Sequence, residues 1–500
     1  MPTTHTHNAN APQATPPTRG RCRRSCARAL LAIVCAGWIV AADAPPAAAQ
    51  SMWELTPYRV QLLAAFEDTP ELPAAMQEDL LARLRVRVDV LIGPTWEFTA
   101  ETAPPRFGRD VIAALEAVTV DDLPGESFTR DKVMLLAVST AADGYRVAVR
   151  ELDVRTRVFS PIVIRPVRQP GRLLDEVSTA MLAAFAPLAQ VEQVAGKEVT
   201  LRLKAGALPP RDPHLTMVHP GDAFQPIIRH NDREGNLHRD DDGRPVLPKP
   251  VPWTFCHVIT VSDEPTAPGQ LHCSLHSGLR SALSGRRRGR FEQLALAVLP
   301  PRNSTDLLVR SQTDATMPLA GYDVYAHPPD SKIGVLVGRT DYRGRVSIPP
   351  GDGVLRVLLV RHGGAPLARL PVVPGLEAEL TVQIPDDDQR LEVEGFVTGL
   401  QEELVDLVIR REVLMARARA RLESGRLDEA KKLIDLLPPL EEAQSDLSDK
   451  LAAQRRHARA ADPAINAKIE SLIADTEALL KKHLAPEAVA KLRKQLKEAR

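Results

Sequence analysis

Two cysteines and three histidines lie close together in the sequence between residues 256 and 276. They form the pairs Cys256-His257 and His272-Cys273, and His276 follows. Zinc in proteins is held by four nitrogen or sulfur ligands in a tetrahedron, so this set has the composition of a zinc site. Neighbouring residues of a strand point to opposite faces, however, so the cysteines and the histidines would lie on different sides of a sheet. One ion could not easily take all four ligands, and we expect no metal site here.

The same two cysteines could instead form a disulfide. Residues 253–261 and 270–275 have the pattern of two strands, joined by a loop with two prolines and a glycine. If residue 261 pairs with residue 268, Cys256 and Cys273 lie opposite each other, within reach of a disulfide bond at a non-hydrogen-bonded pair. The sequence favours this disulfide over two buried free thiols, and both of these over zinc ligands.

A polar segment over residues 230–249 is the second place where candidate ligands gather. It contains Asp232 and the run Asp240-Asp241-Asp242. Loops rich in carboxylates can bind calcium, but the spacing of an EF-hand is absent and acidic loops are commonly just solvated. We interpret the segment as an exposed loop, with the binding of a carbohydrate or a metal as an alternative function.

Catalytic motifs are absent from the sequence. H-E-x-x-H, G-x-S-x-G, S-x-x-K and G-x-x-x-x-G-K-[ST] do not occur. His214, His219 and His230 could meet a serine and an acid across the fold, but surface and turn positions fit these histidines better. We therefore predict no catalytic residues and no bound cofactor.

The first 49 residues have the three parts of a secretory signal peptide. A basic cluster from Arg19 to Arg28 precedes an apolar run over residues 29–42, and small residues end the segment at Ala49. A bilayer-spanning helix needs about 20 apolar residues, so this run is short for that purpose. We predict cleavage after Ala49. An uncleaved anchor, a lipid on Cys35 and twin-arginine export through Arg23-Arg24 are the alternatives.

Removal of this segment changes the charge and the cysteine content of the chain. The full sequence has 64 basic and 64 acidic residues, and the segment contains five arginines, one aspartate and three of the five cysteines. The remaining chain is slightly acidic and its charges are well mixed, which argues against binding to nucleic acid. The remaining cysteine pair fits an oxidising compartment.

Residues 55–190 alternate the patterns of strands and helices. Strands are expected over 58–66, 88–99 and 132–139 and in a hairpin over 145–167, and helices over 73–86, 110–118 and 173–188. This order predicts an α/β layer domain. It is similar to the small α/β domains of exported envelope proteins such as the Tol-Pal propeller protein, curli-secretion lipoproteins and a flagellar assembly protein.

A second domain is expected over residues 196–303. The segment Met217-Val218-His219-Pro220-Gly221-Asp222-Ala223-Phe224 resembles the V-x-x-G-D-x-F turn of the small β-barrels that follow such α/β domains. Pro220-Gly221 would form the tight turn, Asp222 would cap it, and Phe224 would return to the barrel core. The resemblance implies an assembly or scaffold component, not an enzyme.

Residues 304–386 have the pattern of an Ig-like β-sandwich, with six short strands between proline and glycine turns. The stretch Gly338-Arg339-Thr340-Asp341-Tyr342-Arg343-Gly344, followed by Val346-Ser347-Ile348, resembles the carboxypeptidase regulatory-like family. In that family a threonine-aspartate turn with a glycine three residues on joins two strands. The resemblance implies a non-catalytic accessory module.

Residues 391–500 are expected to be helical. Gly425 is a natural stop, residues 427–437 and 440–457 fit two further helices, and Asp462-Pro463 fits an N-cap followed by proline at the first helical position. Residues 420–430 resemble the turn of one tetratricopeptide repeat, but no second copy follows at a fixed period. Helical hairpins or a short coiled coil are therefore expected.

Together these patterns predict a multidomain α+β protein of the bacterial periplasm or cell surface. We expect a non-enzymatic scaffold or adaptor whose partners are envelope proteins, with self-association through the C-terminal helices and membrane attachment only if the signal is an uncleaved anchor. The alternatives are a hydrolase of cell wall or peptide with an accessory β-sandwich, or a surface protein that binds a carbohydrate or a metal.

Overall fold

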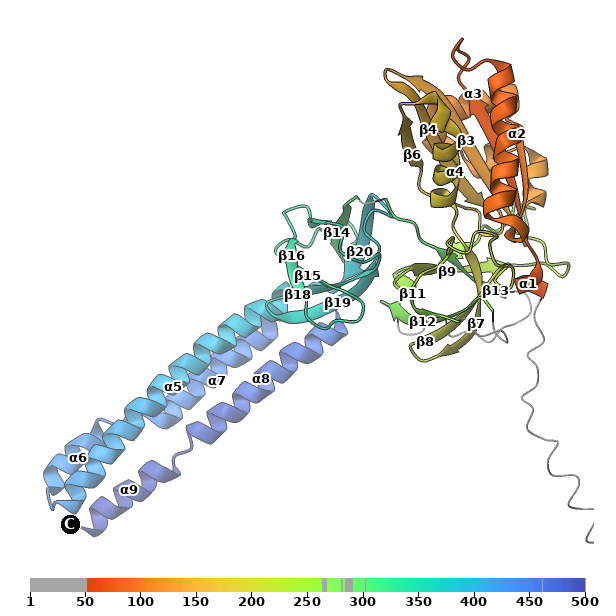
Figure 1. Ribbon diagram of the computed structural model, residues 1–500. Coiled ribbons are helices and arrows are strands. Elements are labelled where there is room, and N and C mark those ends of the chain that lie inside the picture. Colours follow the sequence, from red (N-terminus) through yellow and green to blue (C-terminus); the bar gives the residue numbers. More distant parts are fainter. Residues whose placement is uncertain are drawn as a thin grey trace, which may run out of the picture. The chain divides into compact units, whose positions relative to one another are not determined.

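The computed structural model describes residues 52–262, 268–279, 282–283, 291–301, 303–460 and 462–499 (Figure 1). The predicted signal peptide, with Cys35 and the cleavage site after Ala49, lies outside the described residues. Residues 50–500 form one compact unit. It contains a mixed α/β sheet, a small barrel, two further sheets and long C-terminal helices, so the predicted multidomain α+β class is confirmed.

The first sheet is mixed and six-stranded. Strands β2, β1 and β3 are parallel neighbours, β4 runs antiparallel to β3, and both β5 and β6 pair with β4. Its strands are β1 (Tyr58–Phe66), β2 (Trp96–Thr102), β3 (Lys132–Ala141), β4 (Gly144–Asp153), β5 (Val158–Phe159) and β6 (Val163–Val167). The predicted hairpin is therefore present as β4 paired with β5 and β6.

Helices pack on both faces of this sheet. Strand β3 is apolar without alternation because Met134 and Leu136 enter one hydrophobic core while Val133 and Leu135 enter the other. One core contains residues of α2 (Ala74–Leu91) and α4 (Leu173–Ala184), and the other contains residues of α3 (Pro105–Ala114). Short elements complete the layer: α1 (Met52–Leu55), η1 (Gly93–Thr95), η2 (Leu115–Ala117), η3 (Val120–Asp122), η4 (Gly125–Thr129) and η5 (Pro170–Arg172).

The second sheet closes into a six-stranded barrel. The order is β9-β11-β12-β8-β7-β13, and β13 pairs with β9 to complete the ring. The short β10 pairs with Ile227 and Ile228 of β9. The strands are β7 (Leu188–Ala195), β8 (Glu198–Leu203), β9 (Ala223–His230), β10 (Lys249–Pro250), β11 (Thr254–Val261), β12 (Gln270–Ser277) and β13 (Phe291–Ala297). The predicted small barrel is thus present, and β7 starts where a helix was expected to end.

The turn before β9 has the predicted construction. The Asp222 carboxylate accepts a hydrogen bond from the backbone N–H of His219 at 2.7 Å, and Gly221 has a positive φ of 96°. Phe224 is fully buried in the barrel core. The short motif therefore does fix the entry of the chain into the barrel.

Residues 305–384 form two sheets around one core. One sheet has the order β17-β14-β20 and the other β16-β15-β18-β19, as expected for a sandwich. The strands are β14 (Thr305–Ser311), β15 (Asp323–His327), β16 (Val335–Arg339), β17 (Arg345–Ile348), β18 (Arg356–His362), β19 (Ala365–Val372) and β20 (Glu379–Ile384). In the predicted turn, Asp341 accepts hydrogen bonds from the N–H groups of Arg343 and Arg345 at 2.8 and 2.9 Å.

The C-terminal helices pack side by side around a core of leucine and isoleucine residues (Figure 1). They are α5 (Asp388–Glu423), α6 (Leu427–Asp435), α7 (Leu440–His457), α8 (Pro463–His483) and α9 (Glu487–Glu498). Asp462 caps α8 by accepting from the N–H of Ala464 at 2.7 Å, as predicted. Within the described parts of the chain, no helix is long and apolar enough to cross a membrane.

Candidate functional site

The structure keeps Cys256 and Cys273 as free, buried thiols. The predicted register is wrong: Val261 pairs with Leu271, a β-bulge follows at residues 258–260, and Cys273 stands opposite Val258 while Cys256 stands opposite Leu275. The disulfide is therefore not present in the structure. Burial raises the pKa of Cys273 to about 12 and raises the pKa of Cys256 well above its ordinary value, so both remain protonated.

The histidines beside these cysteines do not complete a metal site. His257 and His276 face each other with ring centroids 6.0 Å apart, whereas both cysteines belong to the barrel core. Burial, followed by the charges of His257 and Arg369, lowers the pKa of His276 to about 4. Among the described residues, no three His, Cys, Asp or Glu side chains gather as metal ligands.

Asp232 and Asp240, which were considered as calcium ligands, accept hydrogen bonds that close turns. Asp232 accepts hydrogen bonds from the N–H groups of Glu234 and Asn236 at 2.9 and 2.8 Å. Asp240 accepts from Asp242 and Arg244 at 3.1 and 2.8 Å. The loop over residues 230–249 is thereby ordered, and part of it forms one wall of a cavity.

The three histidines considered for a catalytic triad have separate local contacts. His230 packs edge-on against Phe291 at 4.3 Å, and His219 lies 3.9 Å from the Asp222 carboxylate. His214 donates its backbone N–H to Asp212.

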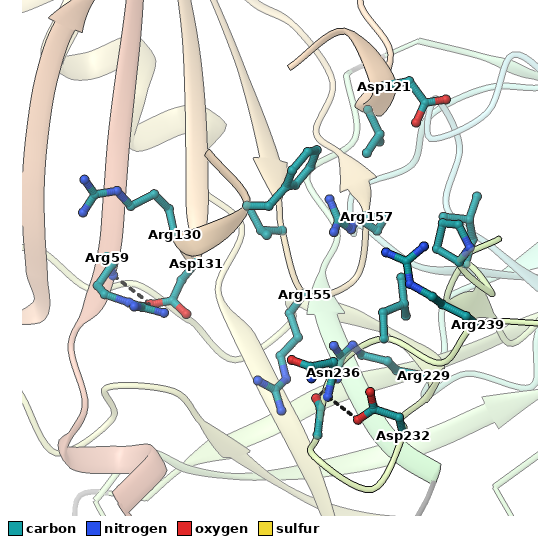
Figure 2. A pocket seen from close by; sticks show the side chains of 17 residues that line it. Arg59, Asp121, Arg130, Asp131, Arg155, Arg157, Arg229, Asp232, Asn236 and Arg239 are labelled. Atoms are coloured by element: carbon teal, nitrogen blue, oxygen red, sulfur yellow. Dashed lines mark hydrogen bonds and ion pairs between the residues drawn. The ribbon is translucent and has the colours of Figure 1, made fainter. Parts of the chain in front are cut away.

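A cavity of about 750 Å³ opens between the amino ends of β1 and β3 and the loop after β9 (Figure 2). Its two walls belong to one packed unit, because Tyr58 of the α/β sheet and Ile227 of the barrel share a hydrophobic core. We call this cavity the arginine cleft. Its described lining consists of Arg59, Val120, Asp121, Phe128, Arg130, Asp131, Val154, Arg155, Arg157, Arg229, Asp232, Gly235, Asn236, Leu237, Arg239, Pro245 and Leu247.

Positive charge exceeds negative charge in the lining, which contains six arginines and three aspartates. Asp131 is already paired with Lys204 at 2.9 Å and with Arg59 at 3.5 Å. Burial raises the pKa of Asp131, but the positive charges of Lys204 and Arg59 lower it by more. The pKa of Asp131 therefore lies below its ordinary value. This carboxylate is therefore charged and engaged, and it does not neutralise the arginines deeper in the cleft.

Arg229 lies close enough to both Arg155 and Arg157 for their positive charges to repel. Burial lowers the pKa of Arg157 and the charge of Arg229 lowers it further; burial and then Arg155 lower the pKa of Arg229. The Glu292 carboxylate accepts hydrogen bonds from Nη2 and Nε of Arg155 at 2.7 and 3.0 Å. It also lies 3.4 Å from Nη1 of Arg229. One carboxylate thus faces two guanidinium groups.

Arg157 and Arg229 retain unused hydrogen-bonding capacity. Arg229 is only 9% exposed and its Nε is buried without a hydrogen-bond partner. The guanidinium of Arg157 lies over the Phe128 ring at 4.1 Å, and no ion pair to Arg157 occurs in the described structure. A guanidinium group without a carboxylate partner in a half-enclosed cavity, such as that of Arg157, is costly unless an anion joins it.

A buried network holds the turn that presents Arg155 and Arg157. The Asp153 carboxylate accepts from the N–H and the hydroxyl of Thr156, both at 2.7 Å, and lies 2.9 Å from the Lys132 ammonium. Arg157 adopts a left-handed φ of 59°, which is unfavourable for a residue with a side chain. The surrounding contacts maintain this strain, as is common at functional sites.

No motif in the sequence indicates the arginine cleft, because its charged residues come from five separate segments. Arg155 and Arg157 lie close together in the sequence, but the pattern there predicts only the turn of a hairpin.

Helix α5 presents a second feature, an exposed apolar face. Val405, Ile409 and Val413 follow one another at four-residue intervals and are 53%, 56% and 44% exposed. Residues four apart lie on the same side of a helix, so the three form a continuous stripe. We call them the α5 face.

An exposed apolar patch also lies on β16, an edge strand of the sandwich. Val335 and Leu336 in β16 and the preceding Ile333 are all more than half exposed. Edge strands of this kind can pair with another chain.

Comparisons with known proteins identify no family. No family model and no curated protein matches the chain. Among solved structures, TolB from Acinetobacter baumannii is similar at 12% identity, with 66% of this chain and 96% of that chain covered and a TM-score of 0.17. The Bacillus anthracis TIE protein has 10% identity, coverage of 45% and 46%, and a TM-score of 0.13.

The major pilin subunit BcpA of Bacillus cereus has 9% identity, coverage of 51% and 71%, and a TM-score of 0.14. The chain therefore has a weak structural similarity to TolB and to a pilin subunit, and no function follows from it. The similarity to the carboxypeptidase regulatory-like family stays a prediction.

Proposed function

We propose that this chain is a non-enzymatic scaffold or adaptor of the bacterial cell envelope that associates with a second copy of itself through the α5 face. The observation that carries the proposal is the exposure of Val405, Ile409 and Val413 on one side of a 36-residue helix. Apolar side chains at this spacing are normally covered by a partner helix. The export signal expected from the sequence supports the location in the envelope.

The sequence of the α5 face is self-complementary. A two-fold axis at Ile409 would place Ile409 against its own copy and Val405 against Val413 of the second copy. Pairing of this type is isologous, so it forms a closed dimer and needs no other partner.

The charges beside the α5 face support the same antiparallel arrangement. Glu402 and Asp406 flank its first half, and Arg410 and Arg417 flank its second half on the same side. In an antiparallel pair with the axis at Ile409, Glu402 approaches Arg417 of the copy and Asp406 approaches Arg410.

Hydrolysis, the runner-up function, is less well supported by the arginine cleft. Burial raises the pKa of Asp131 and Asp232, but ion pairs lower that of Asp131 and backbone N–H groups lower that of Asp232, so both lie below the ordinary value. Neither carboxylate is then suited to donate a proton as a general acid. The described lining also contains no serine, cysteine or histidine as a nucleophile or base. These properties favour binding over bond cleavage.

The proposal is tested by measuring the mass of the protein in solution with light scattering, for the wild type and for Ile409→Lys. Because Ile409 would lie on the axis, one substitution places two charges against each other and we expect a monomer. Val90→Lys, on the exposed side of α2, is the matched control and should leave the dimer intact.

An Ile409→Cys variant checks the geometry, since two copies should become linked by a disulfide under mild oxidation while Val90→Cys should not. A wild-type protein that stays monomeric at high concentration contradicts the proposal. So does a dimer that survives Ile409→Lys but is lost in Val335→Lys, because the edge strand β16 would then be the interface.

A further inference from the structure

We infer that the arginine cleft is a binding site for a phosphate group, either as free phosphate or as the phosphate ester of a small molecule or a lipid. This inference is independent of the proposed dimer, because it concerns the α/β sheet and the barrel and none of the residues of α5.

The first argument is the excess of positive charge around one point. Arg155, Arg157 and Arg229 approach from two different elements, and Glu292 contacts Arg155 and Arg229. Asp121 and Asp232 act on Arg157 and Arg229 at longer range. The six arginines of the lining still outnumber its three aspartates and Glu292 together. An anion bound among them would relieve the repulsion between the guanidinium groups. A phosphate dianion has several oxygens in a tetrahedral arrangement, so it can accept from more than one guanidinium fork, whereas a single carboxylate offers two oxygens in one plane.

The second argument is the buried Nε of Arg229. This donor has no partner in the described structure although Arg229 is nine-tenths buried. Buried donors are almost always satisfied, and Arg229 lines the cleft, so a turn of its guanidinium group would bring this unpaired donor to an anion bound there.

The third argument is the way the cleft is built. The Asp153–Thr156 contacts hold Arg157 in a left-handed conformation, and the Phe128 ring supports its guanidinium from one side. A long arginine side chain that is fixed before the ligand arrives loses little freedom on binding. This arrangement distinguishes Arg157 from an ordinary solvated arginine.

The dimensions and the apolar part of the lining limit the ligand. A cavity of about 750 Å³ has the volume of a small-molecule site. Phe128, Val154 and Leu247 line it beside the arginines, so the molecule that carries the phosphate can also have an apolar part. A free phosphate would occupy only the arginine end.

The test is calorimetric titration of the full-length expressed protein at low ionic strength with inorganic phosphate, with glycerol 3-phosphate and with phosphatidylcholine vesicles that contain phosphatidic acid. Sodium chloride at matched ionic strength and succinate are the controls for general screening and for carboxylate binding. We expect saturable binding in at least one phosphate arm, and the arm with the tightest binding identifies the source of the phosphate.

Arg157→Gln should weaken that binding about tenfold, as expected for the loss of one charge-assisted contact. Arg130→Gln, which lines the same cleft, is the second variant in case Arg157→Gln does not fold. Arg146→Gln is the matched control, because Arg146 is exposed on β4, outside the cleft, and should bind like the wild type.

Three results would overturn the inference: no binding in any phosphate arm, equal binding by wild type and both cleft variants, or tighter binding of succinate than of every phosphate compound. Each can be distinguished from failure of the proposed dimer, because the mass of the protein in solution is measured separately on the same samples.

Discussion

The ammonium group of Lys132 lies 2.7 Å from the carboxylate of Glu151, and both side chains are buried at the junction of the α/β sheet and the barrel. Lys132 also contacts Asp153 at 2.9 Å and donates to the carbonyl oxygen of Ala186. Two carboxylates thus share one buried cation. Removal of that cation leaves uncompensated negative charge in a medium of low polarity.

Substitution of Lys132 by methionine should therefore lower the free energy of unfolding by roughly 3–5 kcal/mol. Urea denaturation followed by circular dichroism measures the change. Lys450→Met is the control, because Lys450 forms exposed ion pairs with Asp446 and Glu403 and its loss should have little effect. Equal effects of the two substitutions would show that the buried network contributes no more than a surface pair.

Glu151 should make the stability of the protein depend on pH. Burial raises the pKa of Glu151 to about 7, even though Lys132 lowers it. The folded state then binds more protons than the unfolded state between about pH 4.5 and about pH 7. The stabilisation from the protonated Glu151 is full below that range and is lost as the pH rises through it.

We expect Glu151→Gln to remove this loss of stability with rising pH. Denaturation midpoints measured across this pH range report the change in stability. Glu101→Gln, at an exposed position of β2 in the same sheet, is the control. A wild-type profile that is flat or rises over the range contradicts the shifted pKa, unless the opposite contribution of His276 masks it.

His276 should act in the opposite direction. Its pKa is lowered to about 4 by burial and then by the charges of His257 and Arg369, so the folded state binds fewer protons than the unfolded state between about pH 4 and pH 6.5. Its contribution to stability is full above that range and is lost as the pH falls through it.

In the Glu151→Gln background, where the opposing contribution is absent, stability should therefore decrease on acidification, and a further His276→Gln substitution should abolish that decrease. His214→Gln, at an exposed position, is the control. If stability decreases equally on acidification with and without His276→Gln, the His276 side chain is solvated or paired in the folded state.

The two thiols of the barrel should be unreactive in the folded protein. Cys256 and Cys273 are buried and protonated, and thiolates are the reactive form of cysteine. Iodoacetamide should label neither residue under native conditions and both after denaturation in guanidinium. A mass lower by two hydrogens, with no labelling after denaturation, would instead reveal the disulfide that the sequence favours.

The sequence predicts the larger elements well because their signals are local. The strand at Tyr58–Phe66 and the helix at Leu440–His457 have the predicted bounds, and Asp462-Pro463 marks the start of α8. These features depend on periodicity and capping within a few residues.

The errors come from effects that act across the chain. Residues 88–91 continue α2 because Val88 packs into the core beneath that helix, although their β-branched composition favours a strand. Strand β19 was missed because it contains Pro366 and Pro371, which an edge strand tolerates. The cysteine register was wrong because a bulge is not visible in the pattern of side chains.

The arginine cleft could not be predicted at all, for a related reason. Arg157 and Arg229 are far apart in the sequence and meet only because the barrel packs against the amino ends of β1 and β3. No motif specifies such a meeting, and each arginine taken alone has the appearance of a surface residue.

The length of α5 has a mechanical consequence for the proposed dimer. Ile409 lies 21 residues after Asp388, the first residue of α5, which corresponds to roughly 30 Å along a helix that rises about 1.5 Å per residue. In an antiparallel pair centred on Ile409, the amino ends of the two helices would then stand about 60 Å apart. The paired helices would act as a rigid spacer that keeps the two β-sandwiches of the dimer at a fixed separation.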